Sequence, residues 1–433
     1  MSENVTEKKI GYRDILCQKE YMKIIVANLI NRFGDSIDAI AFTWLVYAVT
    51  GSAAWTAVIF ALNQIPSVVL QPFAGAFVEG MRKKSVVVVS DFLRGGIVAG
   101  LAALYLADMV TPLVLAVFTL TISSVEAFCM PASTALVPKI LDKEYYAFGT
   151  SLNSTASRIT ELIGMGLAGV LIAALGVGAA ILIDCATFFI SGIITMLVKV
   201  EEKRQKEDIN AGVKAYFGTL KDGFRYVKNK QAVMNFCILA AFANATLVPL
   251  NSLQSAMTVE IFGVGSELLS VFGVASTVGL GIGTVVFPYL IQKFKPLPLV
   301  SVSGIFLGIV YVSMILLSRF TYGDLLLSAM LCAVTVFGMG ASVSFVIGTL
   351  NVQFMKVVEE QYLARAASIF SAGAYAVMPV MSFLISALLL KVSVSVIFLI
   401  CGVLCVVVFA GAGILRIRLE AEPEEINSAA VEE

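Results

Sequence analysis

The chain contains 433 residues, of which 59% are hydrophobic and only 14% are charged, and its 30 basic and 30 acidic residues leave no net charge. Soluble domains carry about 25% charged residues, so this much apolar surface needs lipid as its solvent. Histidine is absent, which excludes histidine metal ligands, histidine proton relays and Ser-His-Asp catalysis.

Other chemistry-bearing motifs are also missing from the sequence. The seven cysteines form no CxxC pair, and there is no G-x-x-x-x-G-K-[ST] loop for ATP. No basic domain or stripe offers contacts to the phosphates of a nucleic acid. We therefore expect no enzyme activity, no cofactor, no bound metal and no nucleic-acid partner.

Twelve apolar stretches are each long enough to cross a bilayer core about 30 Å thick as a helix. The first six cover residues 21–50, 54–78, 85–107, 111–130, 148–175 and 177–200. The second six cover residues 233–257, 266–291, 297–317, 325–348, 368–390 and 392–415. Because the backbone of an open-ended span must satisfy its own hydrogen bonds in lipid, we predict an all-α membrane protein with twelve transmembrane helices.

The basic residues predict the orientation of these spans. If the N-terminus is cytoplasmic, the cytoplasmic turns and the central segment hold most of the loop lysines and arginines, and the opposite turns contain only Arg319 and Lys391. Positive residues accumulate on the cytoplasmic side of membrane proteins. We therefore expect both termini to be cytoplasmic.

A charged central segment divides the spans into two groups of six. The expected organisation is a cytoplasmic N-terminal segment (1–20), an N-terminal six-helix bundle (21–200), a cytoplasmic linker (201–230), a C-terminal six-helix bundle (231–415) and an acidic cytoplasmic tail (416–433). Within the linker, an apolar stripe from Tyr216 to Val227 indicates an amphipathic helix. Two bundles with a binding site at their interface are the usual arrangement of a secondary transporter.

Ionisable side chains inside spans are the candidates for function, because burying charge in a bilayer is costly. The first span holds the largest set, and spacings of three and four place Asn28, Asn31, Arg32, Asp35 and Asp38 on one helix face. We interpret Asp35 or Asp38 as a group that binds and releases a proton. The alternative is a permanent Arg32–Asp35 ion pair that only fixes helix packing.

Further carboxyls lie in spans four to six. Glu126 and Glu161 are candidates for proton coupling or for binding a cationic substrate, with Arg158 as the charge partner of either. The alternative for both is an ion pair or a cytoplasmic gate. Asp184 is expected closer to the outer surface, with a structural role at a helix end.

A charged group around the second cytoplasmic turn suggests a gate. Glu79, Arg82 and Lys83 lie in this turn, and Asp91 and Arg94 begin the third span. Their charges could pair in one state of the protein and separate in another. The alternative is ordinary anchoring of basic residues at the cytoplasmic surface.

The second group of spans carries almost no charge in its interior. It offers neutral polar side chains, among them Asn244, Asn251 and Gln254. With Asn28 and Asn31, these residues are the predicted lining of a substrate cavity, because apolar pockets with a few polar groups accept large, weakly polar ligands. The alternative is simple packing.

Several motifs resemble those of one transporter family. Residues Gly75-Ala-Phe-Val-Glu79-Gly-Met-Arg82-Lys83-Lys84 resemble the loop G-x-x-x-D-R-x-x-R-R of the major facilitator superfamily, with Glu79 in place of Asp and Gly80 in place of Arg. Further stretches resemble the macrolide-efflux and enterobactin-exporter branch of this superfamily. They are Arg32-Phe-Gly-Asp35-Ser, Trp44-Leu-Val-Tyr47, Ser90-Asp-Phe-Leu-Arg94, Pro131-Ala-Ser-Thr-Ala-Leu-Val-Pro138, Ile183-Asp-Cys-Ala-Thr-Phe-Phe-Ile-Ser191 and Asp222-Gly-Phe-Arg-Tyr226. One departure is Met165, where antiporters of the superfamily often have proline.

This resemblance implies a major facilitator fold, a gate that includes Gly75, and a multi-pass exporter in a bacterial inner membrane. We expect export of hydrophobic or amphipathic, drug- or macrolide-like small molecules by proton antiport with alternating access. The alternatives are a siderophore or metabolite exporter, or an uptake symporter coupled to protons or sodium. The expected partners are a small-molecule substrate, protons and membrane lipid, and the expected oligomeric state is a monomer.

Overall fold

The computed structural model describes residues 12–70, 73–74, 77–78, 81–142, 145–200, 225, 228, 230–358 and 360–417, and the regular elements in this part of the chain are all helices, joined by short turns. A short helix α1 (Tyr12–Leu16) precedes the first group of long helices. These are α2 (Lys19–Thr50), α3 (Ala53–Val69), α5 (Lys83–Leu106), α6 (Pro112–Ile140), α7 (Tyr146–Leu175) and α8 (Val177–Met196).

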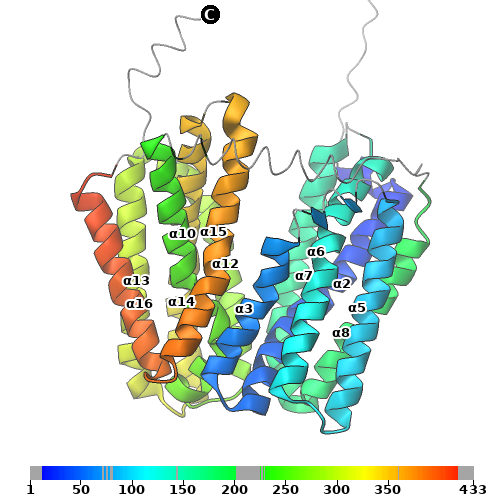
Figure 1. The fold of residues 1–433 in the computed structure, drawn as a ribbon, viewed down its shortest axis with the longest axis horizontal. Coiled ribbons are helices and arrows are strands. Elements are labelled where there is room, and N and C mark those ends of the chain that lie inside the picture. Colours follow the sequence, from blue (N-terminus) through cyan, green and yellow to red (C-terminus); the bar gives the residue numbers. More distant parts are fainter. Residues whose placement is uncertain are drawn as a thin grey trace, which may run out of the picture.

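The second group follows in the same manner. It comprises α10 (Gln231–Ser252), α11 (Gln254–Ala256), the π-helical turn η2 (Met257–Phe262), α12 (Glu267–Lys293), α13 (Pro296–Thr321), α14 (Leu325–Val357), α15 (Glu360–Leu388) and α16 (Val394–Ile414). Figure 1 shows the two groups as separate bundles. Among the described residues, nine helices are long and apolar enough to cross a membrane. Helix α2 is outside that set because it carries charged and polar side chains along its length.

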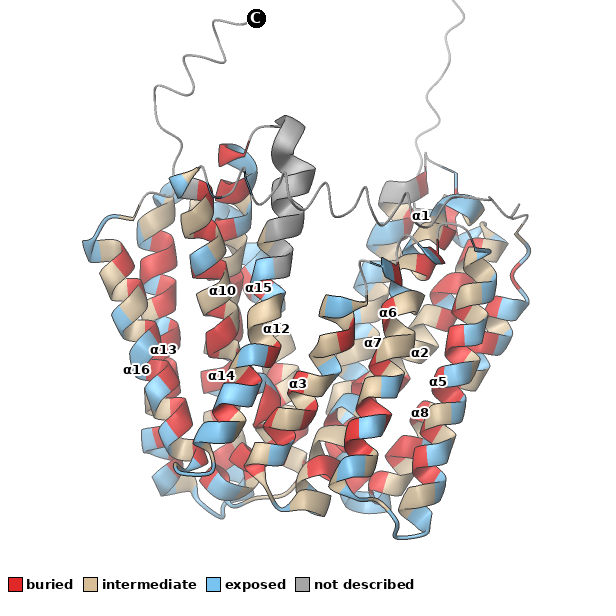
Figure 2. Cartoon of the chain, in the orientation of Figure 1, coloured by how far each residue is buried: buried red, intermediate tan, exposed pale blue. Residues whose placement is uncertain are grey.

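The outward surfaces of the helices are apolar. Leu113 of α6, Val285 of α12 and Val334 of α14 are 71%, 70% and 73% exposed. Water would make such exposure unfavourable, whereas lipid tails are as apolar as the side chains themselves. Figure 2 shows exposed residues along the helices together with the buried ones, as expected for helices that face lipid on one side and neighbouring helices on the other.

Several span boundaries differ from the sequence prediction; for example, α14 ends at Val357 instead of residue 348, and α15 begins at Glu360 instead of residue 368. The fourth span does not end at Met130, because α6 continues through Pro131 and Pro138 to Ile140. Prolines are tolerated inside membrane helices when neighbouring groups satisfy the freed backbone. The seventh span breaks at Leu253 and continues as the short α11 and then η2, which is capped by Gly263 with a positive φ of 68°.

The two bundles meet at one end and separate at the other. Helix α2 begins, and α16 ends, at the side where Figure 1 shows the bundles apart, which we call the open end. Contacts between the bundles join α3 to α15, α7 to α12 and α2 to α11. We call the opposite side, where α2 leads into α3, the closed end.

Several predicted elements cannot be compared with the structure. The amphipathic stripe of the linker lies almost entirely in residues 201–224, outside the described part of the chain, and so does the acidic tail from residue 418. Gly75 and Glu79 of the predicted gate are also outside it.

Candidate functional site

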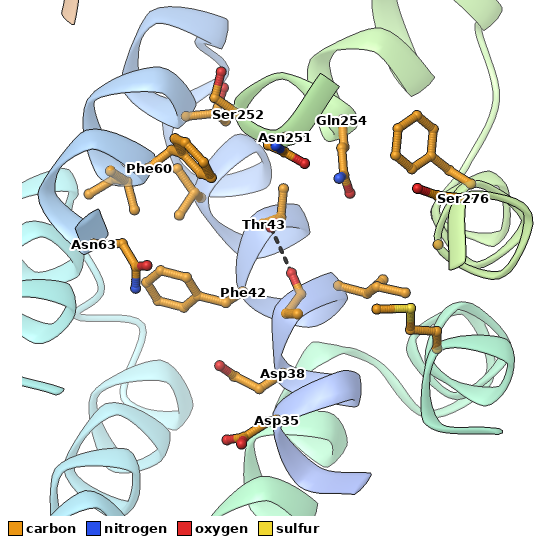
Figure 3. Close-up of a pocket in the computed structure, with 18 of the residues that line it drawn as sticks. Asp35, Asp38, Phe42, Thr43, Phe60, Asn63, Asn251, Ser252, Gln254 and Ser276 are labelled. Carbon is orange, nitrogen blue, oxygen red and sulfur yellow. Dashed lines mark hydrogen bonds between the residues drawn. The ribbon is translucent and has the colours of Figure 1, made fainter. Parts of the chain in front are cut away.

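A cavity of about 480 Å³ lies between the two bundles. Its lining comes from α2, α3, α5, α6 and α7 on one side and from α10, α11 and α12 on the other. Of the predicted site residues it includes Arg32, Asp35, Asp38, Arg94, Glu126, Asn251 and Gln254. Figure 3 shows Asp35 and Asp38 on one helix, with Asn251 and Gln254 across the cavity from it.

Helix α2 places the two carboxyls of Asp35 and Asp38 in the cavity. Their spacing of three residues puts them on the same helix face, as the sequence predicted. The opposite face of α2 is fixed by close packing, because a Cβ built on Gly164 of α7 would lie 2.7 Å from Ser36 Cβ. We call Asp35, Asp38 and Glu126 the acidic wall of the cavity.

Asp35 pairs with a residue that the sequence analysis assigned to the gate. Arg94 of α5 donates from Nη2 to Asp35 Oδ1 at 3.0 Å, so the Arg32–Asp35 pair considered above is not the one formed. The guanidinium also lies over the Phe188 ring, 4.1 Å from its centroid. Arg94 is only 8% exposed, and it joins α5 to α2 and α8 beside the cavity.

A buried hydrogen-bond network lies next to this pair. Asp91 of α5 is 1% exposed and accepts from Asn31 Nδ2 at 3.1 Å and from Ser191 Oγ at 2.8 Å. Both oxygens of this carboxyl therefore have a neutral donor. The three residues connect α2, α5 and α8, and none of them lines the cavity.

Asp184 does not lie at a helix end, which corrects the interpretation drawn from its motif. It is the eighth residue of α8 and is 1% exposed. The charged groups that act on it are Asp38, Asp35 and Arg94. The sequence could not reveal this placement, since it depends on how α8 packs against α2.

The remaining predicted acids separate in the structure. Glu126 lines the cavity, whereas Glu161 does not. Glu161 instead accepts a hydrogen bond at 3.0 Å from Arg158, whose side chain is 64% exposed. Of the two partners considered for Arg158, the structure selects Glu161.

The wall contributed by the second bundle is uncharged. We call Asn251, Gln254, Phe272, Ser276 and Thr277 the neutral wall. Asn244 is not part of it, because it lines a different cavity with Phe354 and Tyr375. Asn28 of α2 does not line the cavity either, and its amide donates to Asn153 Oδ1 at 3.3 Å.

The sequence analysis missed other lining residues. Asn63 of α3 lines the cavity and donates from Nδ2 to Ser123 Oγ of α6 at 2.9 Å. Phe42 and Phe60 lie near it in Figure 3, and Phe42 packs on Phe118 with ring centroids 5.3 Å apart. Phe42 follows Asp38 by four residues, which places it on the same face of α2 as the two carboxyls. This spacing is the signal in the sequence that could have predicted its position.

The described part of the predicted gate lies at the open end. Arg82 precedes the first residue of α5, and Lys83 Nζ donates to the Met81 carbonyl at 3.1 Å. Asp91 and Arg94 lie two and three turns further along α5. Arg94 is thus a neighbour of the cavity rather than of the turn.

Among the described residues, no group of three or more Asp, Glu, Cys or His side chains is arranged to hold a metal ion.

Hydrogen bonds between the bundles hold the closed end together. Tyr47 Oη donates to Glu260 Oε1 of η2 at 3.0 Å. Ser382 Oγ of α15 donates to the Ala57 carbonyl of α3 at 2.6 Å. These contacts cross from one bundle to the other and must break before the closed end can open.

Tyr47→Phe should therefore increase the population in which the closed end is open. One net hydrogen bond contributes about 0.5–1.5 kcal/mol, which corresponds to a shift of roughly two- to tenfold. Spin labels at Met109 and Lys391, in a background without native cysteines, would report the distance between the bundles at this end. Tyr105→Phe, which removes a hydroxyl within the first bundle, is the matched control. An equal response of the two variants would contradict the assignment.

Comparisons with known proteins agree with this architecture. Residues 24–371 match the sequence model of the Major Facilitator Superfamily. The chain is 25% identical over 301 residues to the MFS-type transporter YkuC of Bacillus subtilis, covering 67% of this chain and 69% of YkuC. It is 25% identical over 239 residues to the multidrug efflux pump Tap of Mycobacterium bovis, covering 53% of this chain and 56% of Tap. The match to Tap thus spans just over half of either protein.

Solved structures resemble the whole chain in fold. The nucleoside transporter NupG superposes with a TM-score of 0.72 at 13% identity, covering 92% of this chain and 98% of NupG. A bacterial homologue of the iron transporter ferroportin, in an inward-facing state, gives a TM-score of 0.67 at 13% identity, covering 91% and 98%. The family match across most of the sequence, together with this fold, shows that the chain belongs to the Major Facilitator Superfamily and is a transporter rather than an enzyme.

Proposed function

We propose that this protein exports hydrophobic or amphipathic small molecules by proton antiport with alternating access. The observation that carries the proposal is the cavity between the bundles, which has an acidic wall on one side and a neutral wall on the other. The acidic wall can exchange protons, and the neutral wall with its aromatic neighbours suits large ligands of low polarity. The relationship to Tap, a multidrug efflux pump, supports export and this substrate class.

The geometry supports alternating access by movement of whole bundles. The cavity is bounded by both bundles, and the bonds at the closed end join residues of different bundles. Separation at the closed end and closure at the open end would expose the same carboxyls to the other compartment. We propose that the spans number twelve, that both termini are cytoplasmic in an inner membrane, that the open end faces the cytoplasm, and that the protein is a monomer.

The roles of the carboxyls follow from their placement. Asp38 and Asp35 both line the cavity, but only Asp35 is held in an ion pair with Arg94. We assign Asp38 as the group that exchanges a proton with the cavity. We assign Asp35 as the group whose ion pair with Arg94 changes when Asp38 gains or loses that proton. Glu126 adds negative charge that favours a cationic substrate. In this proposal the Arg82–Lys83 turn closes the open end when the closed end opens.

Asp38→Asn should abolish export driven by a pH gradient. Asparagine keeps the shape of the carboxyl but cannot bind and release a proton, so the variant can only equilibrate its substrate. The measurement is ethidium efflux from energised cells, followed by ethidium movement in proteoliposomes with an imposed pH gradient. Asp35→Asn should also reduce efflux, because Arg94 loses its partner.

The matched control is Asp108→Asn, which removes an exposed carboxyl from the turn between α5 and α6. It should transport at the wild-type rate. Full ethidium export by Asp38→Asn and Asp35→Asn would remove the proposed coupling groups. Ethidium movement in the same direction as protons would show a symporter instead.

A further inference from the structure

Asp184 is a buried carboxyl that the proposed function does not yet use. It is 1% exposed, and its Oδ1 atom has no hydrogen-bond partner. The nearby hydroxyl of Thr187 does not supply one, because it donates to the Asp184 backbone carbonyl at 2.7 Å. A buried carboxylate oxygen without a donor is costly, whereas a protonated carboxyl at the same place is much less so.

The same carboxyl lies against the helix that carries the acidic wall. A Cβ built on Gly34 of α2 would lie 2.8 Å from Asp184 Oδ1. Gly34 precedes Asp38 by four residues, which is about one helical turn. The carboxyl of Asp184 therefore contacts α2 one turn away from the residue that faces the cavity.

The charges around Asp184 leave it without a cation of its own. The charged groups that interact electrostatically with it are Asp38 and Asp35 of α2 and Arg94 of α5. Arg94 is bonded to Asp35 and also interacts electrostatically with Glu126 of α6. Carboxyls that share a site with too few cations do not all ionise together, and one of them keeps a proton.

Asp91 provides a contrast within the same bundle. It is equally buried, but each of its oxygens accepts a hydrogen bond from a neutral donor, Asn31 or Ser191. Such a carboxylate is stabilised without a proton. The missing donor at Asp184 Oδ1 is therefore a specific feature and not a general property of buried acids in this bundle.

We propose that Asp184 is a second proton-binding residue of the transport cycle, which exchanges a proton with Asp38. In this step a cation binds and Asp38 releases its proton to the cavity; the proton held on Asp184 Oδ1 then passes to the vacated carboxylate of Asp38 and from there to the cavity. Both carboxyls end as carboxylates, and the bound cation offsets part of their charge. Asp38 lines the cavity and Asp184 does not, so the two act in series. This inference rests on the proposed proton antiport.

The test measures protons released when a lipophilic cation binds. Purified protein in weakly buffered detergent solution is mixed with tetraphenylphosphonium, and a pH-sensitive dye reports proton release at a series of pH values. In the wild type we expect release on binding. In Asp184→Asn the release should fall to about half or less, since one of two coupled sites is lost. Affinity for the probe should stay within about threefold, because Asp184 does not line the cavity.

The control and the conservative variant complete the design. Asp108→Asn should release protons as the wild type does. Asp184→Glu keeps a carboxyl but moves it, so proton release should persist with a shifted pH midpoint; this variant decides the matter if Asp184→Asn does not fold. If Asp184→Asn released as many protons as the wild type, or if the pH midpoint of Asp184→Glu were unshifted, the role of Asp184 would be overturned while the proposed antiport would stand. Absence of release in the wild type would overturn the proposed antiport together with it.

Discussion

Arg94→Gln should destabilise the protein more than any other substitution considered, and it should abolish transport. Arg94 is 8% exposed, bonds Asp35 at 3.0 Å and lies over Phe188. Removing one partner of a fully buried ion pair costs about 3–5 kcal/mol; the Asp35 side chain is 33% exposed to the cavity, so we expect a loss near or below the lower end of this range. Glutamine retains hydrogen-bonding capacity but not the positive charge. Thermal unfolding of the purified protein and ethidium efflux would measure the two effects.

A second substitution separates charge from packing in this prediction. In the double variant Arg94→Gln with Asp35→Asn no uncompensated charge remains at this pair, so much of the lost stability should return while transport stays absent. Arg158→Gln is the surface control, since an exposed pair contributes about 0–1 kcal/mol and the Arg158 side chain is 64% exposed. If the double variant were as unstable as Arg94→Gln, packing rather than charge would account for the loss.

Gly34→Ala should disrupt the contact between α2 and α8. A Cβ at this position would overlap Thr187 Oγ1 and lie 2.8 Å from Asp184 Oδ1. Overpacking of a tight contact costs about 1–3 kcal/mol, and here it also pushes two carboxyl-bearing helices apart. We expect a lower unfolding midpoint and weaker proton-driven efflux, measured on the same samples.

Two further variants test the cause of this effect. Gly96→Ala is the matched control, because a Cβ there meets nothing within 4 Å, and alanine is a better helix former than glycine. It should be as stable as the wild type or slightly more so. Thr187→Ala combined with Gly34→Ala should recover part of the stability by making room. An unaltered unfolding midpoint in Gly34→Ala would show that the helices can move apart without cost.

The sequence predicted the helices well because lipid imposes a simple length requirement. Apolar stretches such as 177–200 and 266–291 correspond to α8 and α12 to within several residues. The errors arose where local chemistry was ambiguous. The fourth span was predicted to end at Met130, but α6 continues through Pro131 and Pro138, and nothing in the sequence indicated the π-helical turn of η2 after Leu253.

The site was predicted less completely, because contacts between helices depend on packing. The periodicity of α2 correctly grouped Asp35 and Asp38. It could not show that Asp35 binds Arg94, which is 59 residues away, instead of Arg32 on the same helix. Similarly, the polar character of Asn244 said nothing about which cavity it lines. Only the three-dimensional structure shows which residues that are distant in the sequence lie next to one another.

The unequal charge of the two cavity walls bears on how the membrane potential acts. An electric field does work only on net charge, about 2.3 kcal/mol per elementary charge moved through 100 mV. In the proposed antiport the acidic wall changes its charge by one unit with each proton that it binds, whereas the neutral wall carries no charge on which the field could act. At the cavity, voltage would thus bias the conformational cycle through the acidic wall and not through the neutral wall, and its effect would be set by how many protons the acidic wall carries at each step.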